Sequence, residues 1–253
     1  MPRTTLAGLF LAALLALTAC SASAPESGPT SDAESSPSAG ATSPVSSAAP
    51  DDADGGTYSS ADLAGILDTL SEAGGAPLQV IPADQIDQSM AQARQFLESV
   101  TITPEECQVF VSNSLEAPEG AGYSTAISSV NGDAVQTIVS ASSSADPAQA
   151  RARTDAASTA LEACASVSFD AQGVAIEQTV ETVDAVTAAE TTIGTVTVQS
   201  SSDGARQQTM SVVGIRGDLA VTAVRTAQDT LPEGTQDELQ DLIDETLAAA
   251  SKG

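Results

Sequence analysis

The chain has 253 residues, with 34 acidic side chains against 8 basic ones, no histidine and no tryptophan, and its formal net charge is −26. So acidic a chain lacks the basic surface that nucleic acid binding requires. Without histidine it has no usual general base for a serine or cysteine nucleophile, and it contains neither a G-x-S-x-G motif nor a glycine-rich phosphate loop. We therefore predict a non-catalytic protein without a cofactor, a metal site or a nucleic acid partner.

Residues 1–19 have the pattern of a lipoprotein signal peptide. An apolar stretch from Leu6 to Leu17 follows Arg3 and leads into the tetrad LTAC, which ends at Cys20. A run of about a dozen apolar residues fits a signal sequence, whereas a membrane-spanning helix needs about 20. The tetrad resembles the bacterial lipobox, in which the cysteine takes up a diacylglycerol and becomes the acylated first residue. We predict that Cys20 anchors the protein to the outer face of the cytoplasmic membrane; an ordinary secretory signal with an incidental cysteine is the alternative.

Residues 20–56 are predicted to be a disordered tether. Of the 36 residues from Ser21 to Gly56, 29 are Ser, Ala, Pro, Gly or Thr. Such a segment cannot bury enough apolar surface to offset the loss of chain entropy on folding. The remaining residues, 57–253, are enough for one domain with a sizeable core.

Two amphipathic helices are predicted at the start of this domain, over Ser59–Ala73 and Ala83–Ser99. In each of them aliphatic residues recur every three or four positions. Ser59 or Ser60 would cap the first helix. The glycines at 74 and 75 would end it.

The two remaining cysteines are expected on two further helices. The TPEE stretch from Thr103 has the pattern of a capping box, and a short helix after it would turn Cys107 and Phe110 inward. A second helix would begin at Pro147 and end near Cys164. Two leftover cysteines in an exported domain most simply pair, so we predict a structural disulfide between Cys107 and Cys164.

Strands are predicted between and after these helices. GYSTAISSV, the turn NGD and AVQTIVSAS have the pattern of a hairpin. Four more segments, enriched in β-branched residues, have the pattern of an antiparallel meander: VAIEQTVETV, TIGTVTVQS, QQTMSVVGIR and LAVTAVRTA. The chain is expected to close on an amphipathic helix, Gln236–Ala249, so the fold class is α+β.

Three charged motifs have ordinary explanations. The Asp51–Gly56 stretch fails the calcium-loop pattern, because Pro50 and Ala61 would fall at ligand positions. The acids of Asp237–Glu245 are expected on the solvent side of the last helix. The RGD at Arg216–Asp218 falls where a hairpin turn is expected, and Gly-Asp favours such a turn.

Three segments carry a resemblance to a known family: PEECQVF, ACASV and RGDLAVTAV. In this order along the chain they resemble the extracellular sensor domain of actinobacterial PknH-type receptor kinases, a family that also occurs as free lipoproteins. The resemblance covers roughly Leu78 to Ala250. It implies a curved antiparallel sheet with helices packed on it, around a cleft for an unidentified ligand. From the segments above we expect about five to six strands in this sheet. The chain departs from the kinases in having one cysteine pair where they carry two, and no binding residues are carried over.

Together these features predict a cell-envelope lipoprotein that presents a non-catalytic ligand-binding or sensing domain outside the cytoplasmic membrane. Its expected partners are the membrane, through the lipid on Cys20, and an unidentified envelope ligand or protein. The alternative is an envelope lipid carrier that holds acyl chains in an apolar cavity. A carrier needs a large apolar interior, whereas this chain is rich in Ala and Val and poor in Phe.

Overall fold

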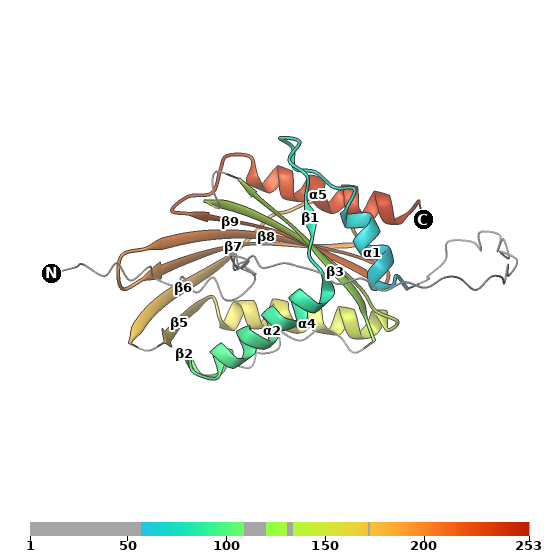
Figure 1. The fold of residues 1–253 in the computed structure, drawn as a ribbon. Coiled ribbons are helices and arrows are strands. Elements are labelled where there is room, and N and C mark those ends of the chain that lie inside the picture. The colour runs from blue at the N-terminus through green and yellow to red at the C-terminus, as the bar shows by residue number, and fades with distance from the viewer. Residues whose placement is uncertain (1–56, 109–119, 131–133, 172, 253) are drawn as a thin grey trace, which may run out of the picture. The chain divides into compact units, whose positions relative to one another are not determined.

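The computed structural model describes residues 57–108, 120–130, 134–171 and 173–252 (Figure 1). The predicted signal peptide, Cys20 and the tether lie outside these ranges, as do Phe110 and the predicted Asn-Gly turn. The described residues form four α-helices: α1 (Ser60–Leu67), α2 (Ala83–Leu97), α4 (Pro147–Ala163) and α5 (Thr235–Ala250). They also form nine strands: β1 (Gln79–Val80), β2 (Thr101–Thr103), β3 (Gly122–Val130), β4 (Val135–Ser143), β5 (Ser166–Ala171), β6 (Val174–Val183), β7 (Thr191–Ser201), β8 (Arg206–Arg216) and β9 (Leu219–Gln228).

The nine strands pair antiparallel in one sheet, in the order β1-β3-β4-β9-β8-β7-β6-β5-β2. The predicted α+β class is confirmed, and so are the hairpin β3–β4 and the meander β6–β9. Three strands were not predicted, namely β1, β2 and β5. β1 and β2 contain two and three residues, which is too short for alternation to stand out. β5 does alternate over its six residues, SVSFDA, but it begins only three residues after the end of α4.

The main core lies on one face of the sheet, which we call face A. Side chains alternate between the two faces along each strand, and the pairing register places Val139, Val212 and Val221 on this face, where all three are fully buried. α1 and α5 cover it. The large aliphatic residues of α5 are all buried on this face: Leu239, Leu242, Ile243 and Leu247.

Close packing on face A depends on Gly214 of β8. A Cβ at this position would lie 2.6 Å from Cγ2 of Ile243 on α5 and 3.1 Å from Cβ of Ala189. Real Cβ atoms do not approach other atoms as closely as the first of these distances. The missing side chain therefore lets α5 and the connection between β6 and β7 lie directly on the sheet.

A second, smaller core lies on the opposite face, face B, near the β5–β2 edge. Val167 and Phe169 of β5 and Ile102 of β2 pack there with Leu97 of α2. The predicted disulfide is present in the same cluster and joins Cys107 to Cys164 with a Cα–Cα distance of 5.8 Å. It joins the chain just after β2 to the chain just after α4.

Two sequence expectations were wrong in detail. α1 ends at Leu67 rather than Ala73, because the chain turns back and Ser71 forms a bridge with Pro77. Thr103 is not a helix N-cap, because it pairs with Ser168 as the last residue of β2 and is followed by a cis Thr103–Pro104 peptide bond. The next helical residue is Cys107, so the short helix begins later than the capping-box pattern indicated.

α2 connects the two edge strands of the sheet. β1 and β2 are eight interstrand spacings apart, which would be about 38 Å in a flat sheet. The 15 residues of α2 form a rod about 22 Å long. The connection to β2 is not extended, because the Val100 N–H donates to the Leu97 carbonyl at 3.1 Å in a turn. Together with the connections at its two ends, α2 therefore crosses the face B side of the sheet from β1 to β2. In Figure 1, α5 lies along the upper side of the sheet and α2 and α4 along the lower side.

Candidate functional site

The two faces of the sheet differ in charge. The strands contain six charged residues, and the register places all of them on face A: Asp170, Glu177, Glu181, Arg206, Arg216 and Arg225. Face B therefore has no charged side chain on any of the nine strands. In a chain with 34 acidic residues this is a strong asymmetry. Face B is the candidate site.

Neutral hydrogen-bonding groups form rows across face B. Thr226, Thr209 and Thr197 are paired neighbours on β9, β8 and β7. The next row, across β9, β8, β7 and β6, consists of four glutamines: Gln228, Gln207, Gln199 and Gln178. Within the rows, the Thr209 and Thr226 hydroxyls are 3.0 Å apart, and Gln199 Nε2 donates to Gln178 Oε1 at 2.8 Å. Uncharged hydroxyl and amide groups that can donate and accept hydrogen bonds thus lie about 4.8 Å apart from strand to strand.

Aliphatic side chains lie beside these polar rows. Ile127, Ile138 and Val224 are paired neighbours on β3, β4 and β9, and Val213 follows on β8 one row further on. A parallel polar row passes through Thr125 and Thr222. Face B is therefore mixed, with aliphatic and hydroxyl groups alternating over short distances rather than forming one continuous apolar lining.

α2 and α4 both cross on the side of face B. α4 leads from the end of β4 to the start of β5, and its C-terminal neighbour Cys164 belongs to the face B core. At the β3 side, Tyr123 Oη donates a hydrogen bond to Asp87 Oδ1 of α2 at 2.5 Å. This hydrogen bond to Asp87, together with burial and the Asp87 charge, raises the pKa of Tyr123 above 10.0. Sequence reasoning singled out neither residue.

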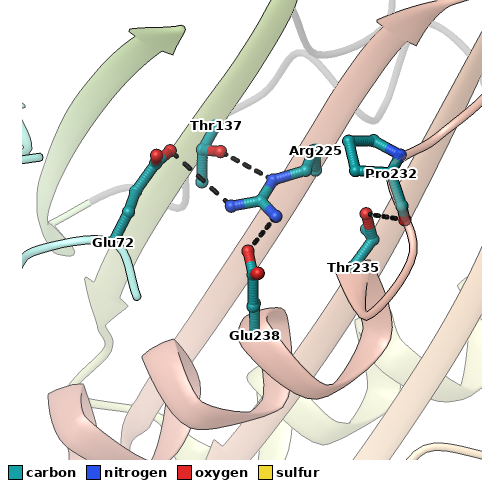
Figure 2. A network of polar contacts seen from close by, with 6 residues as sticks. All are labelled: Glu72, Thr137, Arg225, Pro232, Thr235 and Glu238. Carbon is teal, nitrogen blue, oxygen red and sulfur yellow. Dashed lines mark hydrogen bonds and ion pairs between the residues drawn. The ribbon is translucent and has the colours of Figure 1, made fainter. Parts of the chain in front are cut away.

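A buried polar cluster lies on face A, centred on Arg225 (Figure 2). Arg225 is 4% exposed, and its Nε donates to Thr137 Oγ1 at 3.0 Å. One of its terminal nitrogens pairs with Glu238 of α5, and the other lies 3.7 Å from Glu72 Oε1. This Glu72 oxygen is buried without a hydrogen-bond partner in the described part of the chain. Two carboxylates thus share one guanidinium, which ties α5 and the turn after α1 to the sheet.

The acidic stretch of α5 was expected to be a solvated face, and part of it has a structural use instead. The connection between β6 and β7 runs extended beside α5 and bonds to every fourth helix residue. Gln236 Nε2 donates to the Asp184 carbonyl at 2.6 Å, the Val186 N–H donates to Gln240 Oε1 at 2.7 Å, and the Ala188 N–H donates to Asp244 Oδ1 at 2.7 Å. A two-residue step of a strand nearly matches a four-residue step of a helix, so the bonds stay in register.

The RGD motif forms the predicted hairpin turn. β8 ends at Arg216, Gly217 has φ +60°, and β9 begins after Asp218. Asp218 accepts a hydrogen bond from the Ser143 hydroxyl at 2.6 Å, and Arg216 donates to Ser251 at 2.7 Å. Both charged side chains therefore serve the packing of face A.

No group of three or more His, Cys, Asp and Glu side chains within the described ranges could hold a metal ion. Among the same residues, no helix combines the length and apolar character needed to cross a bilayer.

Comparison with known proteins gives a limited likeness. No family model matches the chain, and no curated protein matches it. The extracellular domain of PknH from Mycobacterium tuberculosis is 13% identical, with a TM-score of 0.47 over 78% of this chain and 93% of that one. An uncharacterised protein of Mycobacterium smegmatis is 19% identical, with a TM-score of 0.38 over 60% of this chain and 76% of that one. Because both TM-scores are below 0.5, no argument about function rests on them, and membership of the PknH-type family stays a prediction.

Proposed function

We propose that the chain is a cell-envelope lipoprotein, anchored through Cys20, whose domain binds an uncharged ligand on face B without catalysis. The observation that carries the proposal is the absence of charged side chains from the strands of this face. The disulfide between Cys107 and Cys164 supports placement outside the cytoplasm, because disulfides persist in oxidising compartments.

The composition of face B favours a neutral ligand for an energetic reason. A charged ligand would lose hydration on this face and find no opposite charge on the strands, which is unfavourable. A neutral ligand can instead exchange hydrogen bonds with water for bonds to hydroxyl and amide groups such as Thr209 and Gln207. Its apolar parts can contact Val224 and Val213. The expected ligand therefore combines uncharged hydrogen-bonding groups with aliphatic surface.

The lipid carrier is the competing function, and the composition of face B is less suited to it. An acyl chain needs a continuous apolar lining, because hydroxyl groups that it covers lose their hydrogen bonds to water. On face B, Ser211 pairs directly with Val224, and Thr222 pairs directly with Val213. The aliphatic pairs Ile138–Val224 and Val213–Ile193 therefore each end at a hydroxyl residue on one side.

Native mass spectrometry of the domain purified from its own envelope tests the binding surface. We expect a non-covalent adduct that Thr209→Arg abolishes, because the new charge lies in the middle of face B. The matched control is Thr179→Arg, since Thr179 is an exposed residue of β6 on face A. An adduct that survives Thr209→Arg would contradict the proposed surface. A bound mass of one or more fatty acyl chains would support the carrier instead.

The anchor is tested separately with Cys20→Ser in the full-length chain. The variant should be released from membranes into the medium or remain unprocessed, because it cannot take up the diacylglycerol. A variant that is processed and stays membrane-bound like the parent would show that Cys20 is not the anchor.

A further inference from the structure

The two ends of α2 are attached to the sheet by very different contacts. At its C-terminal end, Leu97 and Val100 are buried with Phe169 in the face B core, and Phe96 packs against them. The disulfide belongs to the same core, so β2, the end of α4 and the end of α2 meet at one cross-linked corner. This corner cannot separate without exposing apolar surface.

The N-terminal half of α2 is held by fewer contacts, which are the buried side chain of Ile86 and the packing of Met90 against the face B core. Ahead of it, β1 has only two residues, which pair with Ile127 and Ala126 of β3, and the Ile81 N–H donates to the Thr125 carbonyl at 2.9 Å. On the helix itself, the hydrogen bond between Tyr123 and Asp87 is exposed to solvent. α1 and α5 lie close against strands along their length, whereas the backbone of α2 makes no comparable approach to any described strand.

We infer that α2 is a clasp over face B, fixed at the disulfide corner and releasable at the Tyr123–Asp87 hydrogen bond. Breaking this bond frees the first half of α2 to lift away from β3. The lifted helix uncovers the β3–β4 side of face B, where Thr125 and Ser140 lie 3.0 Å apart. An uncharged ligand enters from this side, so the inference rests on the proposed role of face B.

The difference between the two ends sets the order of opening. Segments with few buried apolar contacts open locally at a small fraction of the global unfolding free energy. The N-terminal half of α2 buries only Ile86, whereas the disulfide corner buries a whole cluster that includes Leu97 and Phe169. Local opening should therefore begin at the first turns of α2 and stop before the residues that pack on β5.

Hydrogen–deuterium exchange of the unliganded domain tests the clasp. Tyr123→Phe removes the hydroxyl donor, and we expect the amides of residues 85–90 to exchange about fivefold faster, which corresponds to the loss of about 1 kcal/mol. The amides of residues 94–97 and of β5 should keep the parent rates. Equal acceleration along the whole of α2, or no acceleration at its start, would overturn the inference.

The matched control is Tyr58→Phe. Tyr58 Oη donates to the Ala250 carbonyl at 2.7 Å, so this variant also loses one tyrosine hydrogen bond, but at the end of α5. It should leave exchange in α2 unchanged. Asp87→Asn keeps an acceptor for the Tyr123 hydroxyl without its charge, and exchange at residues 85–90 should lie between the parent and Tyr123→Phe.

The exchange experiment is independent of the ligand, which separates the two proposals. Parent-like retention of the adduct in Thr209→Arg, together with the expected exchange pattern, would reject the ligand surface and keep the clasp. Loss of the adduct in Thr209→Arg without the exchange pattern would keep the ligand surface and reject the clasp.

Discussion

Replacing Arg225 with Met should be among the most damaging single changes on face A. Met is close to Arg in length, so the substitution removes the charge and the donors while it largely fills the same space. Thr137 Oγ1 then loses its donor, and Glu72 and Glu238 lose the guanidinium that they share. Glu72 is only 9% exposed and has no other hydrogen-bond partner for Oε1 in the described structure, so its charge would stay buried without compensation.

The magnitude follows from the cost of breaking a buried ion pair on one side, which is about 3–5 kcal/mol. This is a large share of the 5–15 kcal/mol by which domains are usually stable. For a domain of about 200 residues, each kcal/mol lowers the unfolding midpoint by about 2–4 °C. We expect Arg225→Met to lower the midpoint by about 10 °C.

The companion variant Glu72→Gln should behave in the opposite way. It removes the carboxylate that is poorly paired and leaves Arg225 and Glu238 as a one-to-one pair, so stability should change by no more than about 1 kcal/mol. In the background of Arg225→Met, the same change should restore part of the lost stability, because one of two unpaired charges is gone. Thermal unfolding followed by circular dichroism measures all three. A midpoint of Arg225→Met within about 2 °C of the parent, or a Glu72→Gln variant as unstable as Arg225→Met, would show that the guanidinium does not offset the buried charge of Glu72.

Three further outcomes are expected. Replacing both Cys107 and Cys164 by Ala should lower the free energy of unfolding by about 4 kcal/mol, the chain-entropy value for a loop with a sequence separation of 57. Hydrogen exchange should rise first in α2 and β5, and an unfolding midpoint equal to the parent's would contradict this prediction. Gly214→Ala should destabilise by about 1–3 kcal/mol in urea unfolding, because its Cβ would meet Ile243, whereas a stabilised variant would mean that α5 shifts without cost. Absorbance titration of Tyr58→Phe should show Tyr123 ionising above pH 10, and adding Asp87→Asn should lower this pKa. Because the hydrogen bond favours the neutral phenol, its contribution to stability is present below pH 10 and is lost as the pH rises through the raised pKa. An unchanged pKa of Tyr123 after Asp87→Asn would exclude the hydrogen bond.

Much of the fold is predictable from local patterns, and the exceptions have physical causes. The last helix and the six long strands have long periodic sequences, so their type follows from alternation or three- and four-residue spacing. β1 and β2 are too short for any period, and they exist because β3 and β5 offer them partners. Thr103 shows how strand pairing can override a local sequence pattern. The residues around it favour a helix cap, but its pairing with Ser168 makes it a strand residue.

The candidate site is less predictable than the fold. The face B residues Thr197, Thr209 and Thr226 lie in predicted strands. Charges such as Glu177, Glu181 and Arg225 fall at alternate positions of those strands. Their placement on a common face depends on the register between strands, which no single strand specifies. The contact between Tyr123 and Asp87 depends further on the path of α2 across the sheet. The disulfide between Cys107 and Cys164 was predictable, because the number of cysteines in the sequence suggests it without any knowledge of strand register.

The short edge strands also bear on how the protein behaves when many copies lie close together. An uncovered strand edge can pair with the same edge of a neighbouring molecule and start aggregation. The outer edge of β3 is occupied by Ser60, which accepts from the Tyr123 N–H at 3.1 Å, by Ile81, and by β1. The outer edge of β5 is occupied by β2, which the disulfide at Cys107 holds close by. Reduction of that bond would leave β2 held only by its three-residue pairing with β5 and the packing of Ile102. The cross-link that stabilises the domain therefore also helps to protect the edge of β5 from pairing with another copy.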